Sequence, residues 1–139
     1  YLEDNYPATP LYPDDSFARA NVKSLCQVIS CDIHPINNLR VLKYISDELN
    51  VDDLEKTTWY QHWIRLGFET LEASLTATPY ALGDTVSMVD VYLIPQVYNA
   101  LRFKLDMDAF PKIMAVYRAC NELEAFVQAA PEVQDDCVK

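Results

Sequence analysis

Glycine is scarce in this chain. Only 2 of its 139 residues are glycine, against 8 prolines. Sheets with many tight turns, P-loops and Rossmann turns all depend on glycine, because their backbone adopts positive φ or approaches a ligand closely. The shortage therefore argues against these three architectures.

Basic residues are also few, and long apolar runs are missing. The chain has 11 basic and 21 acidic residues, a net charge of −10. Nucleic-acid phosphates need a basic surface, so we expect no nucleic-acid partner. No apolar run reaches the roughly 18 residues of a membrane span, so we expect no membrane partner. The opening Tyr1-Leu-Glu-Asp does not resemble a signal peptide, and it suggests a chain that begins partway through a larger protein.

The cysteines form no metal or redox motif. There are four, and no CxxC spacing occurs among them. We therefore predict free thiols in a reducing cytoplasm. Cys31 and His34 are three residues apart, but two candidate ligands without a second pair are a weak metal signal, so we expect no metal.

The residues that are present predict helices. Half of them are hydrophobic, enough for the core of one domain. Apolar residues recur at steps of three and four, no strand pattern persists, and a bundle of about five to seven helices follows. Residues 50–53 are expected to cap one helix. Ser87 and Asp90 are expected to cap a central buried helix that follows them. From the cap pattern alone, Ser87→Ala should lower the free energy of unfolding by about 1 kcal/mol, and Asp90→Ala should lower it somewhat less.

Residues 31–44 are the most informative segment. Pro35 has no N–H and disfavours the α conformation at His34, which predicts a kink or break there. A break would present the polar side chains of His34, Asn37, Asn38 and Arg40 to an anion or a peptide-like ligand. The alternative is that these side chains cap broken helix ends. The two interpretations are compatible, because broken ends expose donors.

Three segments, residues 31–44, 83–90 and 91–103, resemble the zeta-class glutathione transferases, which include maleylacetoacetate and maleylpyruvate isomerases. The resemblance implies an all-α bundle like the C-terminal domain of these transferases, with the N-terminal thioredoxin-like domain absent. We expect a tail of that domain plus a linker at 1–13, the helical domain at 14–131 and a frayed tail at 132–139. In this family the thiolate of glutathione adds to a conjugated carbon of a cis keto-diacid, the bond rotates, and the thiol leaves.

The resemblance also assigns residues. It places His34, Asn38, Leu39 and Arg40 at the glutathione cofactor, and Arg40 and Arg102 at the carboxylates of the substrate. No catalytic residue is expected here, because the family's thiol-activating serine and cysteine cluster lies in the N-terminal domain. The chain alone should therefore be inactive, and the full-length protein should be a cytoplasmic homodimer. The alternative for Arg102 is a cation that opposes its own helix dipole.

A second function stays open at this point: a non-catalytic transferase-like domain that serves protein assembly. His34 and Asn38 together with two arginines favour the enzyme, because a docking module does not need two arginines that converge on a cleft. The sequence does not distinguish maleylacetoacetate from maleylpyruvate as the substrate.

Overall fold

The structure is a computed structural model that describes residues 1–137. Within these residues every regular element is a helix. In chain order the elements are α1 (Leu2–Asn5), α2 (Ser16–Gln27), the π-helix η1 (Val28–Ile33), α3 (His34–Asn37), α4 (Leu39–Asp47), α5 (Asp53–Ser74), α6 (Met88–Arg102), α7 (Pro111–Cys120), α8 (Glu124–Ala129) and the 3₁₀ turn η2 (Pro131–Val133). No strand occurs in residues 1–137, where the one β-bridge joins Tyr80 and Gly83. The all-α prediction is confirmed for these residues.

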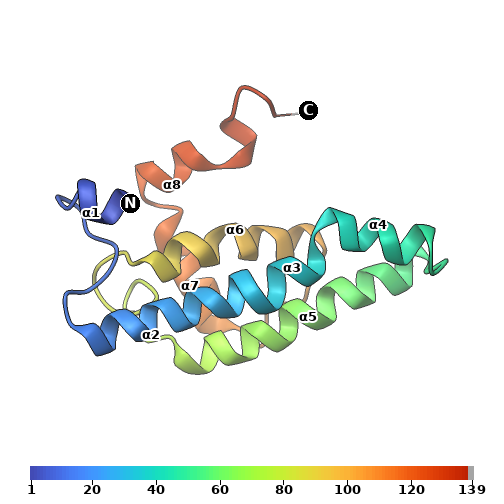
Figure 1. Ribbon diagram of the computed structural model, residues 1–139, viewed down its shortest axis with the longest axis horizontal. Coiled ribbons are helices and arrows are strands. Elements are labelled where there is room, and N and C mark those ends of the chain that lie inside the picture. Colours follow the sequence, from blue (N-terminus) through green and yellow to red (C-terminus); the bar gives the residue numbers. More distant parts are fainter. Residues whose placement is uncertain (138–139) are drawn as a thin grey trace.

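The bundle is elongated, and α6 lies at its centre. Figure 1 shows α2, η1 and α3 as one long rod that runs beside α5 and α6, with α4 at one end. Four apolar residues of α6 are fully buried: Val89, Leu93, Val97 and Ala100. They pack against α2 and α7. The prediction of a central helix after Ser87, apolar nearly all round, is confirmed.

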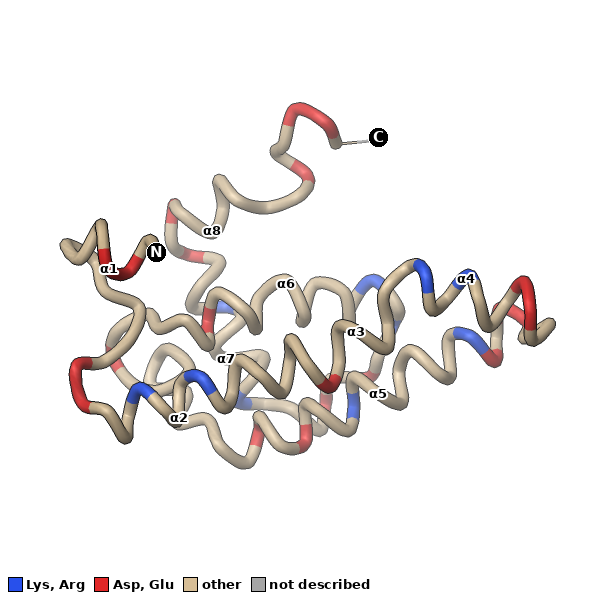
Figure 2. The backbone as a smooth tube through the Cα atoms, in the orientation of Figure 1, with Lys and Arg blue, Asp and Glu red and all other residues tan. Residues whose placement is uncertain are grey.

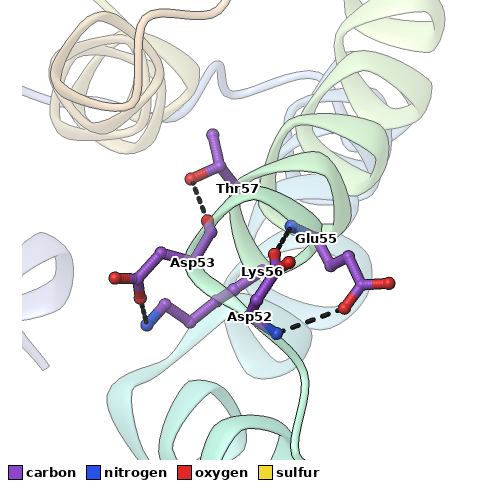
Figure 3. Close-up of polar contacts among 5 residues, drawn as sticks. All are labelled: Asp52, Asp53, Glu55, Lys56 and Thr57. Atoms are coloured by element: carbon purple, nitrogen blue, oxygen red, sulfur yellow. Dashed lines mark hydrogen bonds and ion pairs between the residues drawn. The ribbon is translucent and has the colours of Figure 1, made fainter.

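The N-terminus of α5 is closed by the cap expected at residues 50–53. Asp52 Oδ1 accepts a hydrogen bond from the Glu55 N–H at 2.8 Å, and Glu55 Oε2 accepts from the Asp52 N–H at 3.2 Å (Figure 3). The first four N–H groups of an α-helix have no carbonyl partner within the helix, and these two acidic residues accept hydrogen bonds from two of them. Their negative charges also interact favourably with the helix dipole. Lys56 Nζ lies 2.6 Å from Asp53 Oδ1 and lowers the pKa of that carboxyl.

The N-terminus of α6 is held by a fully buried carboxylate. Asp90 Oδ2 accepts hydrogen bonds from both the N–H and the hydroxyl of Ser87, each at 2.8 Å. Asp90 Oδ1 accepts from the Ala81 N–H at 2.8 Å and from the Cys120 thiol at 3.7 Å. One side chain thus joins the loop before α6, the start of α6 and the end of α7.

The predicted break at Pro35 is wrong. His34 has φ −60° and ψ −43°, and the helix continues through Pro35 to Asn37. The π-helical turn η1 explains this result, because it shifts the hydrogen-bond register just before Pro35 and the missing N–H is not needed in the first turn of α3. The chain leaves the helix three residues later, at Asn38, whose φ of −73° and ψ of 161° are extended.

The C-terminal segment packs on the bundle through Phe126 of α8, which lies against the core. Figure 1 shows α8 above α6, on the side where α1 lies. Within the tail expected at 132–139, Glu132 and Val133 belong to η2, and Gln134 Nε2 donates to the carbonyls of Gln128 and Ala130 at 2.7 and 3.1 Å. Residues 138–139 of that tail lie outside the described residues. Within residues 1–137, no helix combines the length and the apolar character needed to cross a membrane.

Candidate functional site

A cavity of about 350 Å³ lies between the η1–α3 rod and α6, and His34 is one of the residues that line it. The others are Ile29, Ser30, Val91, Tyr92, Pro95, Gln96 and Asn99. The wall therefore combines apolar surface with a hydroxyl, an imidazole, a phenol and two amides. Ligand sites in proteins commonly have this composition, with a few polar groups placed in a mostly apolar lining.

The η1 side of the cavity is fixed by two buried isoleucines, of which Ile29 also lines the cavity. Ile29 and Ile33 are buried in the core, and Ser30 and His34 stay accessible. Gly67 on α5 allows this close packing, because a side chain there would overlap Ile33. Single π-helical turns of this kind are frequent at functional sites.

The α6 side of the cavity continues toward the end of the helix. Tyr92, Gln96 and Asn99 follow one another at steps of four and three, so they share one face of α6. Arg102, three residues further on, is the last residue of the helix and does not line the cavity. The structure therefore places His34 at the cavity wall, and a ligand shared by His34 and Arg102 stays a prediction.

Arg102 is exposed and makes no ion pair with any residue in 1–137. Its Cζ lies 5.4 Å from the centroid of the Phe103 ring, which stacks on Tyr60 at 3.7 Å. Burial raises the pKa of Tyr60, and the positive charge of Arg102 opposes that rise. An exposed cation with no ion-pair partner here suits a substrate carboxylate, and it equally suits the helix-dipole alternative. The substrate role stays a prediction.

The two asparagines make backbone contacts. Asn37, 6% exposed, donates from Nδ2 to the Tyr60 carbonyl at 3.0 Å and ties α3 to α5. Asn38 caps α4, because its Oδ1 accepts from the N–H groups of Arg40 and Val41 at 3.1 and 3.3 Å. Its Nδ2 donates to the Pro35 carbonyl at 2.8 Å. The capping alternative therefore describes Asn38 in this structure, and a contact with glutathione stays a prediction.

Leu39 and Arg40 lie in the first turn of α4 and do not line the cavity with His34. Both are exposed, Leu39 at 67%. Figure 2 shows basic positions at the end of α6 and at the start of α4, toward the same end of the bundle. The convergence of Arg40 and Arg102 on one ligand stays a prediction.

The buried thiols are poor nucleophiles. Burial, reinforced by the negative charge of Asp90, raises the pKa of Cys26 to about 11 and that of Cys120 to about 12. A thiol must ionise to attack, so neither one serves as a nucleophile near neutral pH. Among residues 1–137, no group of three or more His, Cys, Asp or Glu side chains is arranged to hold a metal ion.

Sequence reasoning missed four lining residues: Ser30, Tyr92, Gln96 and Asn99. A signal was present for the last two. Both are amides in a helix that is otherwise apolar nearly all round, and a polar residue in a buried helix needs a reason. Apolar periodicity predicts core positions along this helix, and these two amides are the exceptions to it.

The fold is that of an all-helical domain with a candidate ligand cavity beside α6. Residues 64–124 match the family described as "Glutathione S-transferase, C-terminal domain". A glutathione S-transferase structure from Legionella pneumophila is 43% identical and superposes with a TM-score of 0.92. The match covers 95% of this chain and 71% of the Legionella pneumophila protein. The chain belongs to the glutathione S-transferase family.

Relatives of the zeta class match nearly the whole chain. A probable maleylacetoacetate isomerase from Vibrio cholerae is 50% identical over 138 residues, 98% of this chain. A bacterial maleylpyruvate isomerase described as a zeta-class glutathione S-transferase is 42% identical over 99% of the chain, with a TM-score of 0.94. A maleylacetoacetate isomerase structure from Anaeromyxobacter dehalogenans is 32% identical, with a TM-score of 0.93, and the match covers 99% of this chain and 62% of that protein. That structure carries dicarboxyethyl glutathione and citrate in its active site. The chain spans 64% of the Vibrio cholerae relative and 66% of the maleylpyruvate isomerase.

Proposed function

We propose that this chain is the helical part of a glutathione-dependent enzyme that isomerises the cis double bond of maleylacetoacetate or maleylpyruvate. The observation that carries the proposal is the cavity between His34 and α6, whose mostly apolar wall also presents Ser30, Gln96 and Asn99. Relatives named for these two isomerisations support it. A non-catalytic assembly role is not favoured, because the relatives carry enzyme names.

The cavity suits glutathione as the cofactor. Glutathione is a tripeptide with amide and carboxylate groups, and the cavity presents His34, Ser30 and two side-chain amides within an apolar lining. When bound, glutathione supplies a thiol that adds reversibly to a conjugated carbon and so allows rotation about the former double bond. In this scheme His34 orients the cofactor by a hydrogen bond from its imidazole.

Arg102, and with it Arg40, holds a carboxylate of the diacid. Arginine suits this role because its planar guanidinium donates two parallel charge-assisted hydrogen bonds to one carboxylate. The negative net charge of the chain repels a dianion at long range, so binding depends on cations close to the ligand. Exposure of both side chains leaves their donors accessible.

The buried thiols do not activate the cofactor, and within this proposal a thioredoxin-like segment supplies that group. The enzyme then acts in the cytoplasm as a homodimer, with part of the subunit interface on these helices. The longer relatives are consistent with such a second segment, since each exceeds the length that the chain matches.

The test is a pair of proteins. One is this chain alone, and the other is this chain fused behind the N-terminal segment of the Vibrio cholerae relative. We expect the fused protein to isomerise maleylacetoacetate or maleylpyruvate only when glutathione is added, and the chain alone to give no turnover. The intact relative is the positive control. A folded fusion that turns over neither diacid, in an assay where the relative is active, would contradict the proposal.

A further inference from the structure

Gln96 is a buried amide at the wall of the cavity, and its hydrogen bonding is incomplete. The residue is 4% exposed and lines the cavity together with His34 and Asn99. Its Nε2 is buried and has no hydrogen-bond partner within residues 1–137. More than nine in ten buried polar groups in proteins are paired, so an unpaired donor at a cavity wall calls for an explanation.

Gln96 Nε2 makes no hydrogen bond to any neighbouring group within residues 1–137. None of the polar side chains in the rest of the cavity wall accepts a hydrogen bond from it. That wall is part apolar and part polar, and consists of Ile29, Val91, Pro95, Ser30, His34, Tyr92 and Asn99. Pro95 has no N–H, so the Val91 carbonyl four residues earlier lacks its helical partner, yet Gln96 Nε2 makes no hydrogen bond to it in the structure. The last side-chain torsion of glutamine is broad and roughly two-fold, so the amide can turn its NH₂ toward the cavity without movement of α6.

We propose that Gln96 is a ligand-binding residue that donates a hydrogen bond to a carbonyl or carboxylate oxygen of the molecule held beside His34. The inference rests on the proposed function, which supplies two sources of such an oxygen: the peptide part of glutathione and the carboxylates of the diacid. In either case the ligand completes a hydrogen bond that the folded chain leaves unmade.

This role predicts opposite effects on stability and on binding. Gln96→Met keeps the length of the side chain and removes the unpaired donor, so the unliganded protein should not lose stability. Ligand affinity should fall about fivefold to tenfold, the usual range for one lost hydrogen bond at a buried site. A residue with a purely structural role would give the reverse pattern, with lower stability and unchanged affinity.

Gln61 provides a matched control for stability. Its Nε2 donates to the Phe103 carbonyl at 2.7 Å, and it does not line the cavity. Gln61→Met removes a hydrogen bond that is made in the structure. Its melting temperature should therefore fall by about 2–4 °C, whereas that of Gln96→Met should be unchanged or higher.

The experiment uses the fused protein described above, with thermal melts and calorimetric titration. Glutathione and dicarboxyethyl glutathione are the two probes. Weaker binding of both to Gln96→Met assigns the contact to the peptide part, and weaker binding of the second alone assigns it to the added carboxylates. Gln96→Glu, which keeps the shape and adds a negative charge, should weaken binding of the affected probe further and serves if the Met variant fails to fold.

Two outcomes overturn the inference without touching the proposed function. One is wild-type affinity of Gln96→Met and Gln96→Glu for both probes. The other is a fall in melting temperature of unliganded Gln96→Met as large as that of Gln61→Met, with binding unchanged. A wild-type fusion that binds neither probe overturns the proposed function itself, and this inference with it.

Discussion

Replacement of Asp90 by alanine should destabilise the fold more than any other single change at the start of α6. The carboxylate is fully buried and accepts four hydrogen bonds, two of them from the backbone N–H groups of Ala81 and Ser87. Without it, both N–H groups lose their acceptor in the core. An unsatisfied buried donor costs about 1–3 kcal/mol, so the free energy of unfolding should fall by about 3–4 kcal/mol.

Ser87→Ala should cost less. The Ser87 hydroxyl donates one of the four hydrogen bonds to Asp90, and its removal leaves the carboxylate with three donors and no orphaned backbone group. The expected loss is about 1 kcal/mol. This order reverses the expectation from the cap pattern alone, which placed Ser87 above Asp90.

Urea denaturation of the chain, followed by far-UV circular dichroism, measures both values. Asp106→Ala is the matched control, because the Asp106 carboxylate also accepts a backbone N–H, that of Asp108 at 3.0 Å, but in an exposed loop. Asp106→Ala should lower the free energy of unfolding by less than about 0.5 kcal/mol. If Asp90→Ala cost no more than Ser87→Ala, the carboxylate would not hold the loop, α6 and α7 together as argued.

Three further predictions concern the site and the core. Gly67→Ala should lower the free energy of unfolding by about 1–3 kcal/mol by overlap with Ile33, and Ile33→Val in the same chain should recover part of the loss in a urea titration. In the fused protein, Arg102→Ala should raise KM for the diacid about tenfold, with Arg102→Lys intermediate. KM for the neutral chloro-dinitrobenzene should not change, and an equal effect on both substrates would favour the helix-dipole alternative. The raised pKa values of Cys26 and Cys120, about 11 and 12, mean that the native state holds thiol protons that the unfolded chain releases above about pH 9. Stability should therefore fall as pH rises from 9 toward 11, and a double alanine variant at both cysteines should show a shallower fall in thermal melts.

The elements that sequence reasoning predicted well are those defined by local patterns. The cap of α5 follows from Asp52 and Glu55, three residues apart, and the buried α6 follows from its apolar composition. Such patterns act within one or two helical turns, so spacing along the chain is sufficient evidence for them. The hydrogen-bond partners of Asp90 could not be predicted from local patterns. Ala81 and Cys120 are brought to it by the tertiary fold, 9 and 30 residues away.

The candidate site was predictable only in part. Resemblance pointed to His34 and Arg102; the structure places His34 at the cavity wall, whereas Arg102 ends α6 outside the lining and its contact with a ligand stays a prediction. The same reasoning grouped Asn38, Leu39 and Arg40 with His34, because they are close in sequence. In the fold the cap at Asn38 starts a new helix, and Leu39 and Arg40 leave the cavity wall with it.

Pro35 shows why a correct local rule gave a wrong local structure. The rule states that proline removes a donor and crowds the preceding turn, and both effects hold. A break is one response to them, and a single π-helical turn before the proline is another, since it changes which donors the helix needs. The second response keeps Ile29 and Ile33 in the core and leaves His34 beside the cavity. Burial of these two isoleucines against α5 and α6, which no local rule can weigh, therefore explains both why the helix continues and where the candidate ligand-binding side chain lies.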